Sequence, residues 1–558
     1  MASLQRRVGP LFGVFVALLL LAALRSFYLG TIHSAALRQH ATDEHETIET
    51  VPAPRGTITD RDGVVLAVSE PADDVTADPY LIKEPLVVSQ KLAPLLHEST
   101  DAVLAKLSER SGFVYLAHAL PAKHAQAIAA LRIGKAPIEG IEETPVTRRV
   151  YPRGTLAAQV LGAIGAQGEG VSGLEYSENK TLSGVQGKRE VISDGKGQPV
   201  SIDETRHEQA GKQITLTLDA NIQHRAEQVL AAVGKVFAPK DATAIVMDPR
   251  TGAILAMADW PQVNANDALS GSAESLQNKA VSFDYEPGST FKVVTFSGAL
   301  EEGLITPQSQ FNVPDQIQVA DRTIHDAEEH PEEELSASEI LARSSNVGTI
   351  KIGGLLGANR FNSWAHRFGF GAQPGTGLPG EERGIVISPS QYSGSSMGNL
   401  PIGQGEDVTP LQIATAYAAV ANGGILRTPH VVRSIGGAVL PLPRGRRVIS
   451  AATAAEVRTM LEGVLAPGGT ASEVSIPGYQ LAGKTGTANK IDPQTGEYSE
   501  TRMVASFVGF APASDPKLLC AVVVDEPQTG SVYGGTVAAP AFGQIMAFAL
   551  PYLGVAPE

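Results

Sequence analysis

The apolar segment of residues 290–300 constrains the fold of this chain most strongly. Its sequence, TFKVVTFSGAL, leaves no polar side when it is wound into a helix. A helix that is apolar all round is buried in the core of a large protein. Pro287 and Gly288 interrupt the chain just before the segment, so we expect the helix to begin immediately after them.

Lys292 is the misfit in this helix, and Ser289 precedes it by three residues at the helix N-terminus. At that spacing two side chains share one face of a helix, so the amine can reach the hydroxyl. Burial disfavours the charged form of an amine, and a neutral amine can accept the proton of a serine. The positive end of the helix dipole favours the alkoxide-like character that the serine acquires as it attacks. The pattern predicts Ser289 as nucleophile and Lys292 as its base.

A bare Ser-x-x-Lys pattern more often marks an ordinary helix start with a solvated lysine, so its meaning depends on partners elsewhere. Two later segments are the partners that the pattern requires, and they occur in the required order. These segments are Ser344-Ser345-Asn346 and Lys484-Thr485-Gly486-Thr487. Together the three motifs predict one active site built from distant parts of the chain.

The first of these segments follows a capped amphipathic stretch, SASEILARSS, and is expected to lie in the loop after a helix. Alone, it would be interpreted as a polar helix C-terminus. Beside the first motif, Ser344 is suited to relay a proton between Lys292 and the leaving amine. Asn346 is suited to donate a hydrogen bond to the backbone amide of the substrate.

The second segment lies inside an expected strand, YQLAGKTGTA. Lys484, Thr485 and Thr487 can bind a substrate carboxylate by charge and by hydroxyl donors. Gly486 leaves room for an extended substrate to lie beside the strand. The backbone N–H groups of Ser289 and Thr487 are the expected oxyanion donors.

Strand patterns occur at both ends of the region after residue 211. Residues 242–259 form an expected hairpin, and further strands are expected in YQLAGKTGTA, MVASFVGFAP and LLCAVVVDEP. The segments between them are mainly helical or loop-like. The expected fold class is therefore α+β, with a five-stranded antiparallel sheet, flanking helices and a helical lobe, and with the active site at the seam.

The N-terminus carries a membrane-anchor pattern, because residues 8–24 contain no charged side chain. A cleaved signal peptide is the alternative. The apolar stretch is long and no small-x-small site follows it closely, so we expect an uncleaved anchor. The expected parts are residues 1–29 as a short tail and anchor, 30–50 as a stalk, 51–210 as a non-catalytic domain, and 211–558 as the catalytic domain.

Charge, cysteine and histidine content exclude several functions. A formal net charge of -15 argues against nucleic acid as a partner, because phosphate binding needs a basic surface. The single cysteine, Cys520, lies in the apolar run KLLCAVVVDEP and is predicted to be a small buried strand residue. His325, Glu328 and His330 lie in an acidic loop whose spacing fits no established metal site. No dinucleotide or phosphate fingerprint occurs, so we expect neither a metal nor a cofactor.

With these motifs in place, the chain resembles the class B penicillin-binding proteins, which are peptidoglycan D,D-transpeptidases. Besides the catalytic motifs, the resemblance rests on RGTITDRDG, YPRGTLAAQVLG, GVSGLEYSENKTLSG, GNLPIGQGEDVTPLQIATAYAAVANGG and YGGTVAAPAF, and it covers nearly everything after the anchor. The segment Tyr285-Glu286-Pro287-Gly288 is more similar to the cell-division (septal) members than to the elongation members, where proline commonly replaces the glutamate.

The resemblance implies a cytoplasmic stub, one membrane helix, an elongated, mostly β pedestal domain of the dimerisation type, and an external transpeptidase domain. It implies that the penultimate D-Ala of a stem peptide acylates Ser289, that the terminal D-Ala leaves, and that the amine of a neighbouring stem attacks the ester. It also implies that β-lactams bind at Ser289. The implied partners are peptidoglycan stem peptides, the membrane, a membrane glycan polymerase and cell-division proteins.

Other functions use the same residues. A serine β-lactamase or a D,D-carboxypeptidase would pass the acyl group to water, and a scaffold would have lost catalysis. Class A β-lactamases supply the base for hydrolysis from a Glu-x-x-Leu-Asn loop between their second and third motifs. No such pattern occurs between Asn346 and Lys484. The sequence therefore predicts a long-lived acyl-enzyme and a transferase, with an elongation role as the alternative to a septal one.

Overall fold

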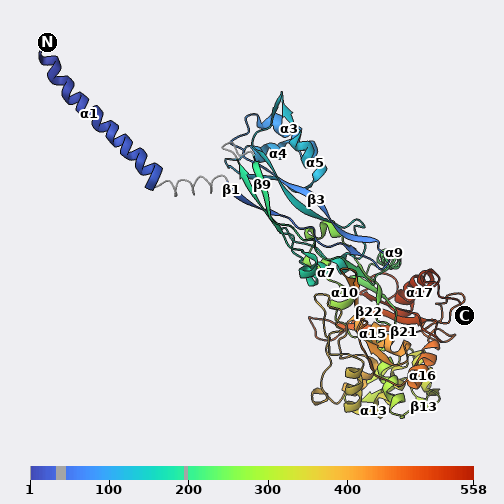
Figure 1. The fold of residues 1–558 in the computed structure, drawn as a ribbon. Coiled ribbons are helices and arrows are strands. Elements are labelled where there is room, and N and C mark those ends of the chain that lie inside the picture. The colour runs from blue at the N-terminus through green and yellow to red at the C-terminus, as the bar shows by residue number, and fades with distance from the viewer. Residues whose placement is uncertain (1, 33–45, 194–198) are drawn as a thin grey trace. The chain divides into compact units, whose positions relative to one another are not determined.

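The computed structural model describes residues 2–32, 46–193 and 199–558, and the chain divides into two compact units (Figure 1). The first unit consists of Met1–Pro54, Pro71–Arg148 and Gly184–Ala210. The second consists of Arg55–Glu70, Arg149–Ser183 and Gly211–Glu558, and it contains all three predicted catalytic motifs.

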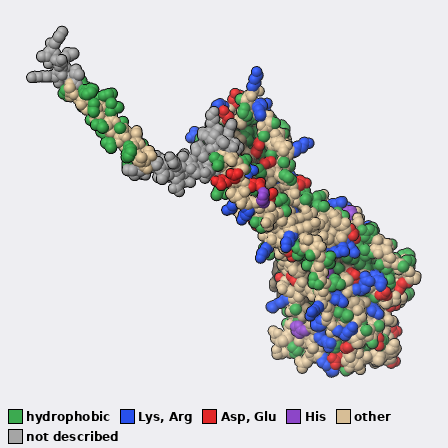
Figure 2. Space-filling model, in the orientation of Figure 1, with side chains coloured by type: hydrophobic (Ala, Val, Ile, Leu, Met, Phe, Trp, Pro, Cys, Tyr) green, Lys and Arg blue, Asp and Glu red, His purple; other side chains and the backbone are tan. Residues whose placement is uncertain are grey.

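The first unit begins with α1 (Ala2–Phe27), which continues into a π-helical turn, η1 (Tyr28–Ile32). Within them, Gly9–Thr31 is a stretch of 23 residues with a mean hydropathy of 2.1, long and apolar enough to cross a membrane. Its hydrophobic side chains are exposed along the helix (Figure 2). This is the segment predicted as an anchor. Most of the predicted stalk, residues 33–45, lies outside the described residues.

The rest of the first unit combines a small sheet with a helical layer. The sheet has three antiparallel strands in the order β1 (Glu46–Val51), β8 (Gly187–Ser193) and β9 (Pro199–Arg206). A separate core forms where β4 (Val114–Pro121) pairs with the last residues of β3 (Val65–Ala77). Its buried side chains come from these strands, α3 (Pro85–Leu96), α4 (Thr100–Leu107) and α5 (Ala122–Ala129).

The second unit is built on a five-stranded antiparallel sheet in the order β12-β11-β23-β22-β21. The strands are β11 (Asp241–Met247), β12 (Ile254–Trp260), β21 (Ala482–Ile491), β22 (Tyr498–Ala511) and β23 (Leu518–Asp525). This confirms the predicted sheet, whose strands come from both ends of the region. Strand β21, which carries the third motif, lies at one edge.

Both faces of this sheet are covered, which explains the unbroken apolar run in β23. Leu519, Ala521 and Val523 belong to one core, whereas Cys520 and Val522 belong to the other. Successive strand side chains point to opposite faces, so a central strand between two cores must be apolar at every position. Cys520 is fully buried, as predicted. Helices α9 (Ala220–Phe237) and α17 (Gly534–Tyr552) cover the face to which Cys520 points.

The other face packs on the helical lobe. Its main helices are α11 (Lys292–Glu301), α12 (Ala337–Arg343), α13 (Asn346–Arg367), α15 (Pro410–Ala421) and α16 (Ala451–Glu462). The lobe also contains short strand pairs that the sequence did not reveal: β13 (Gln310–Val313) with β16 (Glu333–Ser336), β14 (Gln316–Val319) with β15 (Arg322–His325), and β17 (Ile425–Arg427) with β20 (Gly445–Arg447). Each spans only three or four residues, and although β13 (QFNV) and β14 (QIQV) alternate polar and apolar side chains, so short a run does not separate a strand from a loop.

A buried ion cluster joins two segments of the second unit that are distant in sequence. Glu175 is fully buried between the guanidinium groups of Arg55 and Arg149. Arg149 Nε donates to Glu175 Oε1 at 2.7 Å, and Arg55 donates from Nε to Oε2 and from Nη2 to the Glu175 carbonyl. Arg149 also donates to the carbonyl of Gly56 at 2.8 Å. The carboxylate therefore ties residues 55–70 to residues 149–183.

Candidate active site

Ser289 is half-buried in a tight turn that leads into a buried helix. The turn is the 3-10 segment η4 (Gly288–Phe291), and α11 follows directly, with every residue from Lys292 to Leu300 buried. The predicted helix is thus present, although its first turn is 3-10 and not α. Gly288 has a φ of +54°, a left-handed conformation that glycine adopts without strain.

The turn is held in place from two sides. The Gly288 N–H donates to the Gly403 carbonyl at 2.9 Å, and a Cβ on Gly403 would lie 2.2 Å from the Gly288 oxygen. The hydroxyl of Tyr417 donates to the Thr290 carbonyl at 2.8 Å. Just before the turn, Glu286 accepts hydrogen bonds from the Gly405 N–H and from the Tyr498 hydroxyl, each at 3.0 Å.

Lys292 is fully buried and its amine points at the second motif. Nζ donates to the Ser344 carbonyl at 2.7 Å, to Asn346 Oδ1 at 2.8 Å and to Ser344 Oγ at 3.2 Å. Burial lowers the pKa of the Lys292 amine to about 7, and the carboxylate of Asp326 acts in the opposite direction. An amine with this pKa is partly neutral at neutral pH and can accept a proton there.

The second motif is a two-residue joint between helices. α12 ends at Arg343, Ser344 follows with a φ of +62°, and Ser345 caps α13 by accepting the Gly348 N–H at 2.9 Å. The sequence suggested that Asn346 lies in a loop after the helix. In the structure it is the first residue of α13. Its amide is largely engaged, because Oδ1 accepts from Lys292 and Nδ2 donates to the His325 carbonyl at 3.0 Å.

The third motif lies on edge strand β21, as predicted. Lys484 is fully buried, and its Nζ lies 3.3 Å from the Thr485 carbonyl. Burial lowers the pKa of Lys484 well below its ordinary value, and the nearby charge of Lys292 lowers it further. Thr485 Oγ1 lies 2.7 Å from Thr470 Oγ1, and Thr487 Oγ1 accepts the Gly534 N–H at 3.1 Å.

Gly486 is required for a reason that the sequence did not indicate. A Cβ at this position would lie 2.3 Å from Ser506 Oγ, 3.0 Å from Thr290 Cγ2 and 3.1 Å from the Pro287 carbonyl. The glycine thus lets β21 pack against the turn that carries Ser289. The role of Gly486 in leaving room for substrate stays a prediction, and the structure adds that the missing side chain also leaves room for the protein itself.

Asp326 is the functional candidate that sequence reasoning missed. It belongs to the run HDAEEHPEEEL, which we interpreted as a solvated acidic loop. Its side chain is only 6% exposed and contacts His330 and residues 345–347. The acidic composition of the run concealed it, because the neighbouring Glu328 and Glu329 are exposed.

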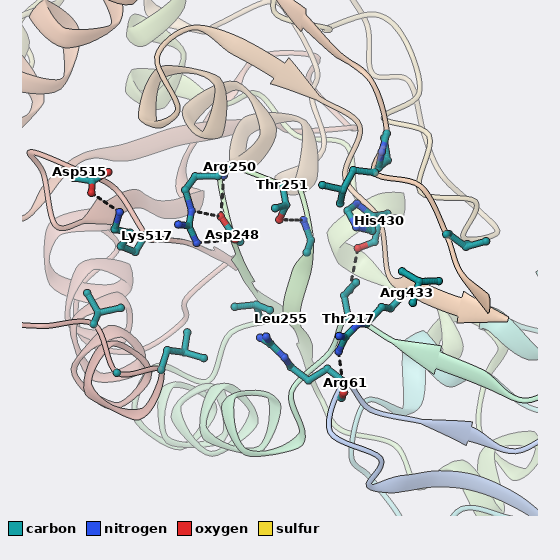
Figure 3. Close-up of a pocket in the computed structure, with 18 of the residues that line it drawn as sticks. Arg61, Thr217, Asp248, Arg250, Thr251, Leu255, His430, Arg433, Asp515 and Lys517 are labelled. Atoms are coloured by element: carbon teal, nitrogen blue, oxygen red, sulfur yellow. Dashed lines mark hydrogen bonds and ion pairs between the residues drawn. The ribbon is translucent and has the colours of Figure 1, made fainter. Parts of the chain in front are cut away.

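A cavity in the second unit lies away from these motifs. It measures about 860 Å³ and includes Arg61, Thr217 and His430 in its lining (Figure 3). Four further charged side chains in its lining form two ion pairs, Arg250 with Asp248 and Lys517 with Asp515. None of the predicted catalytic residues lines this cavity. The chemistry of the side chains, and not cavity size, locates the candidate active site.

Comparison with known proteins gives two family matches. Residues 242–547 match the penicillin-binding protein transpeptidase domain, and residues 50–216 match the penicillin-binding protein dimerisation domain. Among curated relatives, penicillin-binding protein PbpB of Mycobacterium tuberculosis is 35% identical over 95% of this chain and 83% of its own length. Peptidoglycan D,D-transpeptidase FtsI of Escherichia coli is 32% identical over 92% of this chain and 86% of its own length.

Solved structures agree with these matches. Penicillin-binding protein 3 of Mycobacterium tuberculosis, solved with aztreonam, is 29% identical with a TM-score of 0.71, over 91% of this chain and 98% of that one. Penicillin-binding protein 2X of Streptococcus thermophilus is 26% identical with a TM-score of 0.75, over 91% of this chain and 81% of that one.

Proposed function

Because the chain belongs to the class B penicillin-binding protein family and is a peptidoglycan D,D-transpeptidase, we propose that Ser289 forms the acyl-enzyme of the cross-linking reaction. Ser289 Oγ attacks the carbonyl of the penultimate D-Ala while its proton passes to neutral Lys292. Ser344 relays the proton to the amine of the terminal D-Ala, which leaves as the peptide bond breaks. The amine of a second stem then attacks the ester, releases Ser289 and returns a proton to its oxygen.

The observation that supports this assignment most directly is the environment of Lys292. A buried amine three residues after Ser289, with its hydrogens directed at Ser344 and Asn346, has both the lowered pKa and the partners that a proton shuttle needs. Asn346 orients the amine, and its second Nδ2 hydrogen is the one suited to the substrate amide.

Substrate binding is assigned to the edge of β21 that pairs with no other strand of the sheet. An extended stem peptide can lie along this edge as an added strand. Lys484, Thr485 and Thr487 then bind the terminal carboxylate, while Gly486 keeps the strand close to the nucleophile turn. The N–H groups of Ser289 and Thr487 are assigned to the developing oxyanion.

The cellular setting is assigned from the anchor and the relatives. The apolar helix within residues 9–31 would place the chain in the plasma membrane as a single-pass protein, with the catalytic unit outside the cytoplasm. Similarity to relatives named FtsI and PbpB supports a septal role. A membrane glycan polymerase and cell-division proteins are the partners that such a role requires.

The site of acylation tests the proposal. Benzylpenicillin incubated with the detergent-solubilised full chain should add one acyl group, which peptide mass spectrometry should find on the peptide that contains Ser289. Ser344 is a second hydroxyl near the base, at 3.2 Å from Lys292 Nζ. An adduct on the Ser344 peptide, or on no serine at all, would reject Ser289 as the nucleophile.

The lifetime of the adduct separates this function from that of a serine β-lactamase. Hydrolysis of the ester needs a base directed at a water molecule. The Glu-x-x-Leu-Asn pattern that supplies this base in class A β-lactamases does not occur between Asn346 and Lys484. We therefore expect each protein molecule to consume one molecule of penicillin and then to stop. Absorbance of the β-lactam ring reports this directly, and sustained hydrolysis that requires Ser289 would favour the β-lactamase function instead.

A further inference from the structure

Asp326 lies in the connection between β15 and β16 and accepts hydrogen bonds from the second catalytic motif. Its Oδ2 accepts the Ser345 hydroxyl at 2.7 Å, and its Oδ1 accepts the N–H groups of Asn346 and, at 3.0 Å, Val347. The backbone of Asp326 is itself fixed, because its N–H donates to the Asp315 carbonyl at 2.8 Å.

These contacts act on the start of α13. The first N–H groups of a helix have no partner within the helix, and a carboxylate there is favoured by the helix dipole. Asp326 satisfies two of these N–H groups and also holds the side chain of the capping residue, Ser345. The neighbouring His325 carbonyl accepts from Asn346 Nδ2 at 3.0 Å. One short segment therefore fixes both the backbone and the side-chain amide of Asn346.

Asn346 and Ser344 are in turn the groups that contact the Lys292 amine. By fixing Asn346, Asp326 therefore also helps to fix the position of the amine. Asp326 is the charged group that acts on Lys292, and Lys292 in turn lowers the pKa of Lys484. A negative charge stabilises the ammonium form, so Asp326 partly offsets the effect of burial on the pKa of Lys292.

The surroundings of Asp326 also carry charge. His330 Nε2 lies 3.2 Å from Asp326 Oδ2, and His330 Nδ1 lies 3.4 Å from Glu333. Glu333 pairs with Arg343 at 2.9 Å. The positive charge of His330, when it is protonated, therefore faces the two carboxylates of Asp326 and Glu333.

We propose that Asp326 is a positioning residue for the acylation step, which holds the Ser344–Asn346 joint against Lys292 and provides the counter-charge for the ammonium that forms there. This inference rests on the proposed role of Lys292 as the base. When Lys292 takes the Ser289 proton, a positive charge appears in a buried site. A fixed carboxylate that is already ordered stabilises such a charge without reorganisation.

Replacement of Asp326 by asparagine separates the charge from the hydrogen bonds. An asparagine Oδ1 can still accept the two backbone N–H groups, and its Nδ2 can donate to Ser345 Oγ. Acylation of wild-type protein should rise with pH as Lys292 loses its proton, near pH 7. Without the negative charge the ammonium is less stable, so the rise in Asp326→Asn should move to lower pH by about one unit.

Replacement by alanine removes the hydrogen bonds as well. Asp326→Ala should acylate more slowly than Asp326→Asn at every pH, because the joint is no longer held. Glu329→Gln is the matched control, since it removes one charge from an exposed residue of the same loop. Its pH profile should coincide with that of the wild type.

The measurement is the second-order rate of acylation of the full chain by a fluorescent penicillin between pH 5 and 9, with thermal melting of each variant. A profile for Asp326→Asn that coincides with the wild type, or that moves to higher pH, would overturn the inference. It would also be overturned if folded Asp326→Ala acylated at the wild-type rate. If Asp326→Ala does not fold, the Asp326→Asn profile decides alone. If wild-type protein forms no adduct on Ser289, the proposed function fails instead.

Discussion

Replacing Lys292 by alanine will slow acylation by benzylpenicillin by about 10²–10⁴-fold, the loss typical of removing a general base. The amine is fully buried on the helix that follows Ser289, and its lowered pKa fits it to accept a proton near neutral pH. The rate should be measured on the full chain with a fluorescent penicillin, and Ser289→Ala should set the zero level. A rate within tenfold of the wild type would mean that another group is the base.

The same variant is expected to remain folded, although at a cost. In the sequence, Lys292 is a charged residue in an otherwise apolar helix. The structure shows that the amine satisfies Ser344 and Asn346, which would lose their partner. Leaving buried acceptors unpaired costs about 1–3 kcal/mol, partly offset by no longer burying an amine. Thermal melting should therefore show a modest decrease in stability and one cooperative transition for the catalytic unit.

Replacing Glu175 by alanine is expected to destabilise the second unit by about 3–5 kcal/mol, because it leaves two buried guanidinium groups without a counter-charge. Arg149 is 1% exposed and Arg55 is 6% exposed, so water cannot replace the carboxylate. Penicillin acylation after incubation at increasing urea concentrations reports whether this unit is folded. The urea midpoint of Glu175→Ala should fall well below that of the wild type.

Glu456→Ala is the control for this prediction, since Glu456 is an exposed residue of α16 in the same unit. Surface substitutions of this kind usually change stability by about 0.5 kcal/mol or less. Equal midpoints for Glu175→Ala and Glu456→Ala would show that the ion cluster does not hold the segments together.

Local sequence patterns predicted the elements that carry the chemistry. The apolar segment after Ser289 predicted a buried helix, and the alternating and apolar runs predicted all five strands of the central sheet. The order of the three motifs predicted the family, to which the chain belongs. Such patterns can be recognised in the sequence because a helix and a strand each repeat their buried side chains at a fixed spacing.

The short strand pairs around residues 310–336 escaped prediction because each strand spans only four residues. The alternation in β13 and β14 is too short to stand out from the surrounding loops. Residues 85–107 form two helices and not one, because His97 adopts a left-handed conformation and Ser99 caps the second helix by accepting the Ala102 N–H. A break of a few polar residues is difficult to recognise in the sequence when helical patterns continue on both sides of it.

What the sequence determined by itself is the fold class, the buried helix with its amine, and the set of motif residues. The tertiary structure alone decided how these residues are held: Asp326 against Asn346, Gly486 against the nucleophile turn, and Arg55 against Glu175, which lies 120 residues away. These contacts join segments that have no periodic relation to each other. Their energies depend on burial and on exact distances between charges and hydrogen-bonding groups, which only the folded chain defines.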